Sequence, residues 1–423
     1  MMLGRIARVA AVFALALMGT GCGDYFRPVA FPVVPSQPNP GFTHFALVLS
    51  TNGNNNPGAS TTIDVSGDSN ISQATVGLMP VHAAFVEVGT RVYVADRLDN
   101  TVSEFAPTSP TPVTTISLPP GSAPVFVNTT EALTVYVANS GNNTVSAIST
   151  IGNAVTNTLQ VGNNPVSLAE TPNALKLYAT NAGGNSLPGS VSSINPMDFS
   201  LNPPVVPSPA APWISPILAV TRNDSQRVYV LDQGSGFVSA INAANDAVVA
   251  TASVGVGADY LTYDVILNRV YVTNPVAGTL TSLDASTDAL TAKTISIPNA
   301  IAVAALGDGT RVYVSSASVS DKTVTSKVTV LKSTDLSVKT TVPLTSVPVS
   351  PDCTEGTLSD LSIAAAADFS RVYVANCDAG NVSIIQTSND TLALNMPAPL
   401  SAQPPGSNGS PPPQNPVFVV AGP

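Results

Sequence analysis

The chain has 423 residues, of which 44% are hydrophobic and 10% are charged, and its formal net charge is -10. The charged share lies well below the roughly 25% of a typical soluble protein. The acidic balance leaves no basic stripe to neutralise phosphates, so nucleic acid is not an expected partner. A polybasic patch for membrane binding is excluded for the same reason.

Residues 1–21 predict an export signal. Arg5 and Arg8 supply a positive start, and residues 9–18 form an apolar run that is too short to span a bilayer. The run ends in Gly19-Thr20-Gly21-Cys22, which resembles the cleavage box of bacterial lipoproteins, although Gly19 stands where that family usually has leucine. The alternative is an ordinary secretory signal followed by a stray cysteine.

The lipoprotein resemblance implies that Cys22 carries lipid and that this anchor is the chain's only membrane contact. It also implies a place in the bacterial cell envelope, at the outer membrane or the periplasmic face. Residues 22–42 would then be the tether, because five prolines between residues 28 and 40 favour an extended spacer of about 3 Å per residue.

Residues 43–423 carry a repeat and are expected to form one closed domain. A first, degenerate unit has strand-like runs at residues 45–51, 61–65, 71–76 and 82–86. Seven further units each contain a Val or Leu followed by Tyr, at spacings of 42 or 43 residues apart from two gaps of 51 and 60. These tyrosines are Tyr93, Tyr136, Tyr178, Tyr229, Tyr271, Tyr313 and Tyr373.

Each unit predicts four short antiparallel strands joined by turns rich in Asn, Asp and Gly, which is one propeller blade. The Arg269-Val270-Tyr271-Val272-Thr273-Asn274 segment and its copies resemble the YVTN-type β-propeller repeat of bacterial and archaeal surface proteins. The unit count predicts eight blades, with seven as the alternative because that number is commoner in the family. The strand-like residues 416–420 should close the ring beside the first unit.

The repeat also predicts how blades pack. Side chains alternate along a strand, so each tyrosine is expected to be an interblade wedge. Five units begin this strand with Arg, and in three of them Asp224, Asp308 or Asp368 stands three residues earlier. These acids predict local turn pairs or solvated rim contacts with the arginines, with anion binding by a ring of arginines as the alternative.

Two gaps predict long surface connections, at residues 203–216 and 343–360. If Cys22 is lipidated, Cys353 and Cys377 remain as a possible pair in an oxidising compartment. The strand order places the two cysteines on the same face of one blade, so a disulfide that pins the second connection is expected.

Catalytic chemistry has little support in the sequence. The chain contains two histidines and one tryptophan, and it has neither a nucleophile elbow nor a phosphate loop. No metal site or cofactor is predicted, although calcium binding stays an alternative because Asp64, Asp68 and Asn70 carry oxygen ligands. The candidate ligand-binding residues are those expected at one mouth of the central channel, namely His82, Ser167, Asp259, Asn299 and Asp360.

The favoured hypothesis is a lipid-anchored envelope protein whose propeller is a non-catalytic platform for a protein or a surface polymer. The first alternative is an enzyme that resembles lactone-hydrolase or dehydrogenase-like propellers, in which His82, Asp259 and Asp360 would be essential. The second alternative is a surface-layer or adhesion component.

Overall fold

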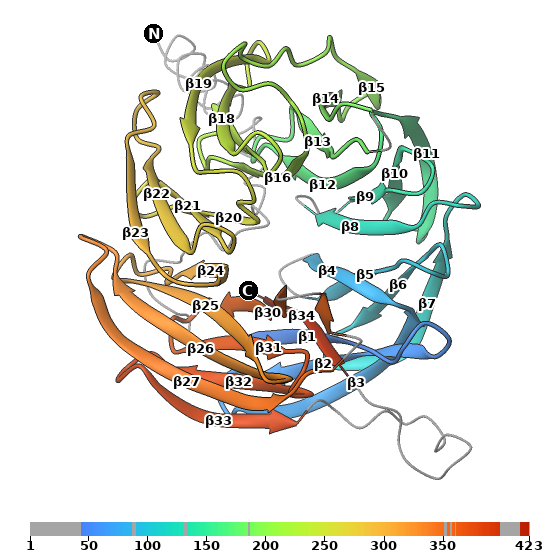
Figure 1. The fold of residues 1–423 in the computed structure, drawn as a ribbon. Coiled ribbons are helices and arrows are strands. Elements are labelled where there is room, and N and C mark those ends of the chain that lie inside the picture. The colour runs from blue at the N-terminus through green and yellow to red at the C-terminus, as the bar shows by residue number, and fades with distance from the viewer. Residues whose placement is uncertain are drawn as a thin grey trace, which may run out of the picture.

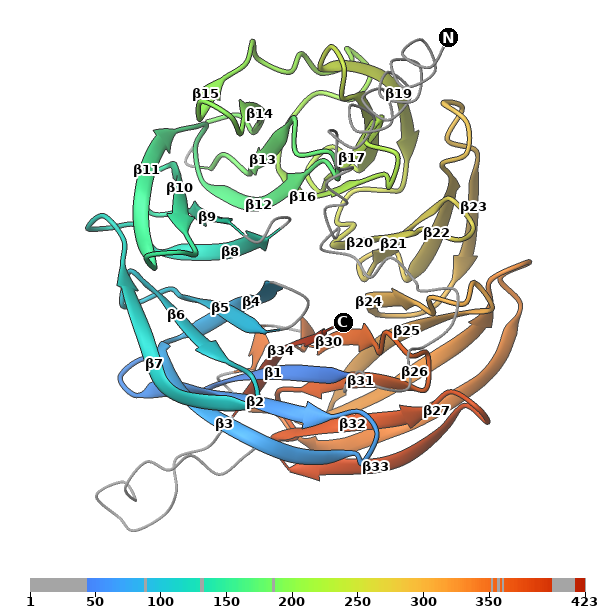
Figure 2. The ribbon, with the colours of Figure 1, turned by 180° about the vertical axis from the view of Figure 1, so that it is seen from behind.

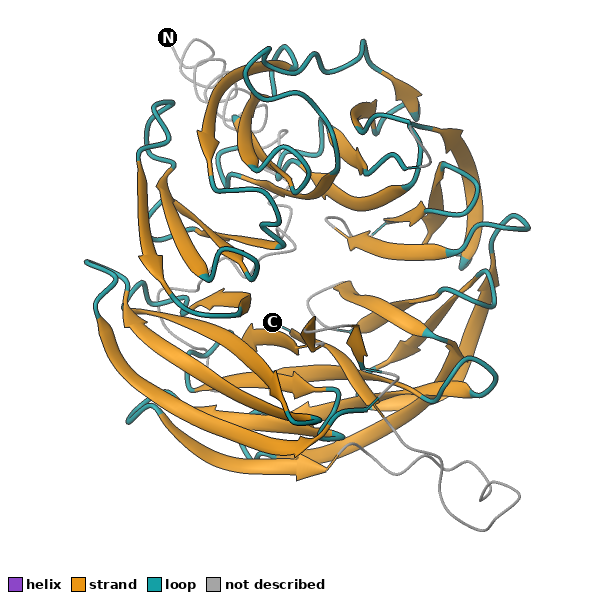
Figure 3. Cartoon of the chain, viewed as in Figure 1, coloured by secondary structure: helices purple, strands orange, loops and turns teal. Residues whose placement is uncertain are grey.

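The chain folds as an eight-bladed β-propeller in a computed structural model (Figures 1 and 2). The structure describes residues 44–86, 90–129, 133–184, 187–350, 353–355, 358–359, 361–397 and 415–422. These residues form strands and loops, and none of them is helical (Figure 3). The predicted signal at 1–21 and the tether at 22–42, with Cys22, lie outside the described residues.

Each blade is a four-stranded antiparallel sheet whose strands are named from the innermost outward. Blade 1 contains β34 (Asn415–Ala421), β1 (Phe45–Thr51), β2 (Pro57–Asp64) and β3 (Ser69–Leu78), and blade 2 contains β4 (Pro80–Val86), β5 (Arg91–Asp96), β6 (Thr101–Ala106) and β7 (Ser109–Ser117). Blade 3 contains β8 (Pro124–Thr129), β9 (Thr134–Asn139), β10 (Thr144–Ser149) and β11 (Ala154–Gln160), and blade 4 contains β12 (Pro165–Glu170), β13 (Leu177–Asn181), β14 (Ser190–Asn195) and β15 (Ser200–Leu201).

Blade 5 contains β16 (Pro216–Thr221), β17 (Arg227–Asp232), β18 (Phe237–Asn242) and β19 (Ala247–Ser253), and blade 6 contains β20 (Tyr260–Asp264), β21 (Arg269–Asn274), β22 (Thr279–Asp284) and β23 (Ala292–Ser296). Blade 7 contains β24 (Ala300–Ala305), β25 (Arg311–Ser320), β26 (Thr323–Lys332) and β27 (Val338–Pro348), and blade 8 contains β30 (Leu361–Ala365), β31 (Arg371–Asn376), β32 (Asn381–Gln386) and β33 (Thr391–Pro397). A small hairpin of β28 (Thr354–Glu355) and β29 (Leu358–Ser359) lies between blades 7 and 8.

The innermost strands form a continuous ring, because each of β34, β4, β8, β12, β16, β20, β24 and β30 contacts the next (Figure 1). The fourth strand of each predicted unit is therefore the inner strand of the following blade, which moves the blade boundaries relative to the sequence units. β34 pairs with β1, with Val419 opposite Val48. This pairing confirms closure by the C-terminal strand and eight blades in place of seven.

Tyrosines fill the spaces between blades, as predicted. Val270, Tyr271 and Val272 are all 0–1% exposed, because both faces of the strand pack against a neighbouring sheet. Buried side chains form eight clusters, each drawn mainly from two adjacent blades, and seven of the clusters contain one of the repeat tyrosines. The core is thus a ring of eight interblade layers.

Several of these tyrosines also donate a hydrogen bond to a turn of the next blade. The acceptor is the Oδ1 atom of Asn153 for Tyr93 (2.7 Å), of Asp246 for Tyr178 (2.5 Å) and of Asp390 for Tyr313 (2.6 Å). The three acceptor residues have φ of +47°, +58° and +56°, a left-handed conformation that Asn and Asp tolerate better than most residues. One turn residue therefore both shapes a hairpin and satisfies a buried hydroxyl.

The arginines also reach across to the next blade, and the predicted local turn pairs are wrong. Arg227 binds Asp288 (2.7 Å), and Arg371 binds Asp68 (2.9 Å). Arg311 lies 3.1 Å from Asp390. The acids expected as partners are engaged elsewhere, since Asp224 pairs with Arg222, Asp308 accepts from Thr310, and Asp368 accepts from Ser370.

Both long connections differ in part from the prediction. Residues 203–216 do join β15 to β16, but they fold back onto the protein, with Val205, Ala211 and Trp213 no more than 6% exposed. Val205 and Trp213 pack in the same cluster as Tyr178 and Val228, beside a β15 strand of only two residues. Residues 343–348 belong to β27, which pairs with β26 along most of its length. Cys353 and Cys377 form a disulfide, with Cα atoms 5.4 Å apart.

Candidate functional site

Eight equivalent positions on the inner strands form one layer around the axis. In seven blades the residue at this position pairs with the residue two places after the repeat tyrosine, as His82 does with Ala95. In blade 1, Phe418 pairs with the corresponding Leu49. The layer consists, in order, of Phe418, His82, Phe126, Ser167, Leu218, Tyr260, Ala302 and Ser362.

The residue just before this layer sits in a β-bulge in six of the eight blades. The pairing register shifts there, for example between Pro80 and His82, so one inner-strand residue has no partner opposite it. All six bulged residues are β-branched, aliphatic and half-buried. We call them the axial collar, which comprises Val81, Val125, Val166, Ile217, Ile301 and Val417.

His82 lies between two phenyl rings from the blades on either side. Its ring centroid is 3.9 Å from that of Phe126, in a stacked arrangement, and 4.6 Å from that of Phe418. The Val127 backbone N–H donates to Nδ1 of His82 (3.3 Å). Burial lowers the pKa of His82 to about 3, so the ring is neutral at physiological pH. Because Nδ1 accepts a hydrogen bond, the proton of the neutral ring is on Nε2.

Serines at the same layer make the same bond between inner strands. Ser167 Oγ accepts from the Ala219 backbone N–H (3.4 Å), and Ser362 Oγ accepts from that of Val419 (3.2 Å). Ser167 is 0% exposed, so this predicted site residue holds two blades together and does not face a ligand. His82 performs that structural task with Nδ1 and retains a second polar atom, Nε2.

The other predicted site residues are not brought together with His82. Asp259 is half-buried and accepts a hydrogen bond from Gln233 Nε2 (2.8 Å), and burial raises its pKa. Asn299 is exposed in the turn before β24, with φ of +58°. Asp360 lies outside the described residues. Beside the polar residues that were predicted, the inner strands carry aliphatic and aromatic side chains in and next to the layer that contains His82. The sequence signal for these aliphatic side chains is the Pro-Val, Pro-Ile or Ala-Ile pair at or next to the start of each of the six bulged inner strands.

The same fold recurs among solved structures. The chain is similar to apo AztD from Citrobacter koseri, with a TM-score of 0.61 and 11% identity over 90% of this chain and 98% of that chain. It is also similar to a candidate 6-phosphogluconolactonase from Bacteroides fragilis, with a TM-score of 0.53 and 13% identity over 91% of this chain and 99% of that chain. The sequence matches no protein-family model and no curated protein. At these identities the likeness concerns the fold alone.

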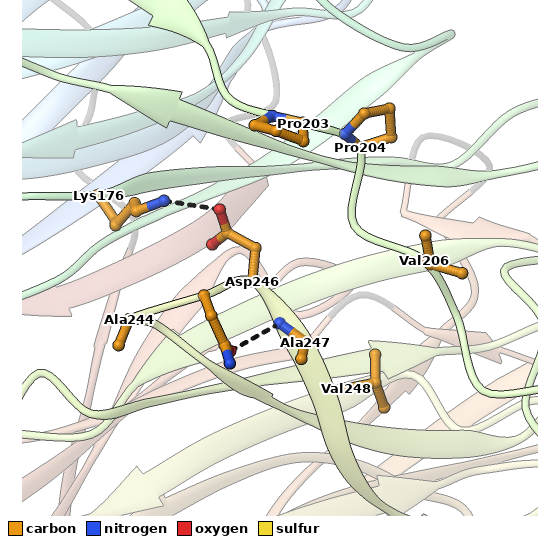
Figure 4. Close-up of a pocket in the computed structure, with 9 residues that line it drawn as sticks. Lys176, Pro203, Pro204, Val206, Ala244, Asp246, Ala247 and Val248 are labelled. Atoms are coloured by element: carbon orange, nitrogen blue, oxygen red, sulfur yellow. Dashed lines mark hydrogen bonds and ion pairs between the residues drawn. The ribbon is translucent and has the colours of Figure 1, made fainter.

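A hollow of about 560 Å³ lies at the edge of blades 4 and 5, beside the proline-rich connection (Figure 4). Lys176 Nζ lies 2.6 Å from Asp246 Oδ2, while Tyr178 donates to Oδ1 of the same carboxylate. Ser193 adds a third donor to Asp246. The charged groups of this hollow are therefore already bonded to one another, as part of the tie between the two blades.

Metal-binding groups do not converge in the described part of the chain. No three His, Cys, Asp or Glu residues in it lie close enough to hold an ion. Of the acids that left calcium open, Asp68 binds Arg371 and Asp64 accepts from Ser66. The described residues form no helix that is long and apolar enough to cross a membrane.

Proposed function

We propose that this protein is a lipid-anchored component of the bacterial envelope whose propeller is a rigid, non-catalytic platform for a protein or a surface polymer. The observation that carries the proposal is the use of its ionisable side chains. Asp246, Asp288 and Asp390 all accept hydrogen bonds or ion pairs from a neighbouring blade, so these carboxylates stiffen the ring. A structural use of the ionisable groups is what a rigid platform requires.

The anchor part of the proposal rests on the sequence around Cys22 and on the YVTN-like repeat. Cells that express the protein are labelled with an alkyne analogue of palmitate, and the protein is then isolated. We expect label on the wild-type chain and none on the Cys22→Ser variant, which should be released from the membrane fraction. Equal labelling of the two proteins, or wild-type protein free of label, would contradict the anchor.

The platform part is tested by chemistry and by contact. The purified propeller is assayed with sugar lactones and with oxidisable sugars plus added quinone or nicotinamide cofactor, and turnover at the background rate is expected. Photo-crosslinking from exposed Val256 and Val276, compared with exposed Ile151, is carried out in intact cells. One crosslinked species that depends on the position of the probe supports a platform. Turnover well above background would overturn the non-catalytic assignment.

The lactone-hydrolase alternative draws on the likeness to the Bacteroides fragilis protein. It needs charged groups that converge on one substrate, whereas Asp259 is bonded to Gln233 and His82 is neutral between two phenyl rings. If lactone turnover is found, alanine at His82, Asp259 and Asp360 should abolish it. The three variants therefore separate the two functions.

A further inference from the structure

The axial collar is the least expected surface of this chain. A water-filled channel would favour hydroxyl side chains, which the chain has in abundance and which occur at Ser167 and Ser362 one residue further along. Instead, all six bulges carry Val or Ile, and their side chains are only half-buried. Each partly exposed aliphatic group forgoes part of its transfer free energy from water, at about 25 cal/mol per Å² of apolar surface left exposed. Six such groups at equivalent positions of the inner strands offer apolar contact to a ligand.

The bulges themselves explain how these side chains come to be in this place. In a regular ladder each inner-strand residue lies opposite a partner, and its side chain enters one of the two interblade layers. A bulged residue has no partner in that register, and the local bend of the strand turns its side chain in another direction. Val81, Val125, Ile217, Ile301 and Val417 each pack at the border of an interblade cluster without being enclosed by it.

We propose that the axial collar and the stack of Phe418, His82 and Phe126 form a binding site for an uncharged, planar aromatic molecule that carries a hydrogen-bond acceptor. The collar supplies apolar contact around the axis, and the stack supplies aromatic faces and edges. The Nε2–H group of His82 supplies one hydrogen-bond donor, which orients the ligand.

Charge selects against anionic ligands. The eight inner strands contain neither Lys nor Arg, so no cation on them would neutralise an anion. His82 does not become a cation at physiological pH, because burial lowers its pKa. Asp259 precedes the layer residue Tyr260 and would repel an anion wherever it is ionised. These residues therefore disfavour an anionic ligand relative to a neutral one of the same shape.

The acceptor requirement follows from the tautomer of His82. Nδ1 is engaged by the Val127 N–H, and no described residue bonds to Nε2. A ligand oxygen or ring nitrogen that accepts from Nε2–H satisfies this donor, whereas a hydrocarbon of the same shape leaves it without a partner. The site should therefore distinguish two planar molecules of equal size by one atom.

The test uses coumarin, a neutral planar molecule with a carbonyl oxygen, together with naphthalene and 2-naphthoate. Long-range ¹H–¹⁵N spectra of the full chain report its two histidines directly. We expect the wild-type His82 signals to show the Nε2–H tautomer and to shift with coumarin, while naphthalene and 2-naphthoate bind roughly tenfold more weakly.

The variant His82→Ser keeps an acceptor for the Val127 N–H, as Ser167 and Ser362 do in their own blades. It should remain folded and bind coumarin roughly tenfold more weakly, with a melting temperature lowered only by the loss of the ring stacking. Phe126→Leu should also weaken binding, while Phe199→Leu, which removes a phenyl ring stacked on Tyr136 away from the axis, should not.

Three results would overturn the proposed site. The first is that the His82 signals do not shift with coumarin at millimolar concentration. The second is that folded His82→Ser protein binds coumarin as tightly as wild type does, and the third is that wild type binds 2-naphthoate as tightly as coumarin. If His82→Ser does not fold, the wild-type spectra and the two phenylalanine variants decide the question. The outcome does not depend on the proposed platform role, since neither enzyme assays nor crosslinking enter the test.

Discussion

Asp96 is a buried carboxyl at the end of β5, and replacing it with asparagine should stabilise the protein. The residue is 0% exposed. Its Oδ2 accepts from Ser103 (2.7 Å) and Thr101 (3.3 Å), and its Oδ1 lacks a comparably close partner among the described residues. Burial raises the pKa of Asp96 to about 7, and the hydrogen bonds from Ser103, Thr101 and the Gly77 backbone offset only part of that shift.

Other blades have asparagine at this position. Asn139 Nδ2 donates to Thr144 Oγ1 (2.9 Å) and to Ser146 Oγ (2.8 Å), and Asn376 Nδ2 donates to Ser383 Oγ (2.8 Å). Asn139 also leaves its Oδ1 without a partner, but a neutral amide loses much less on burial than a carboxylate does. An asparagine at position 96 would meet Ser103 and Thr101 in the same way.

The pKa shift sets the size and the pH window of the effect. An acid whose pKa is higher in the folded state than in the unfolded state makes folding less favourable as pH rises from the unfolded-state pKa to the folded-state pKa. For Asp96 this interval runs from its ordinary 3.8 to about 7. Roughly three pKa units correspond to a cost of up to about 4 kcal/mol at pH 8. In a domain of roughly 380 residues, that is a melting-temperature difference of about 5 °C.

Calorimetry at pH 5 and pH 8 measures this difference. We expect Asp96→Asn to melt several degrees above wild type at pH 8 and closer to it at pH 5. The reverse substitution, Asn139→Asp, should lower the melting temperature at pH 8 and is the matched control. A wild type as stable as Asp96→Asn at pH 8, or a difference that is equal at the two pH values, would refute the reasoning.

Three further predictions concern the ties between and within blades. Tyr313→Phe removes the hydrogen bond to Asp390 and should cost about 1–2 kcal/mol in thermal unfolding. Tyr271→Phe should cost less than about 0.5 kcal/mol, because the Tyr271 hydroxyl lies near Arg269 and Asp264 without a well-aligned hydrogen bond, and equal losses would contradict this difference. Replacing Cys353 and Cys377 together by serine removes a disulfide between residues 24 positions apart and should destabilise the protein by about 3 kcal/mol. Detection of two free thiols by mass spectrometry, in protein isolated from the envelope, would show that the bond is absent. The pKa of His82 is lowered in the folded state, so the stability contributed by the neutral ring is complete above pH 6.5 and is lost as pH falls toward 3. His82→Ser should therefore lose less stability than wild type over that pH range. An equal loss in the two proteins, measured by melting temperature against pH, would contradict the lowered pKa.

Most of the fold follows from local features of the sequence. The Val-Tyr-Val strands alternate regularly, and the turns between them carry Asn, Asp or Gly, so the number of blades and the burial of Tyr271 and its counterparts could be predicted. Ring closure could be predicted too, because residues 416–420 repeat a strand pattern that lacks its own partners. These inferences need only the period of the repeat and the principle that sheet edges are covered.

The contacts between blades could not be predicted in the same way. Arg227 lies near Asp224 in the sequence but binds Asp288, which is 61 positions away in the next blade. The surroundings of the candidate site could not be predicted for a related reason. His82 and Asp259 were placed by their position in the unit, whereas the β-bulges at Val81 and Val125 depend on strand register, which composition does not report.

The pairing of β1 with β34 has a consequence for how the chain is made. The Thr51 hydroxyl of β1 donates to the backbone carbonyl of Asn415 in β34, which lies 364 positions further along the chain. During synthesis or export, β1 emerges early and must wait for almost the whole polypeptide before its inner neighbour arrives. A vacant strand edge held open for that interval can pair with another chain. Premature release or stalled translocation should therefore leave an aggregation-prone intermediate, which makes chaperone supply a determinant of yield.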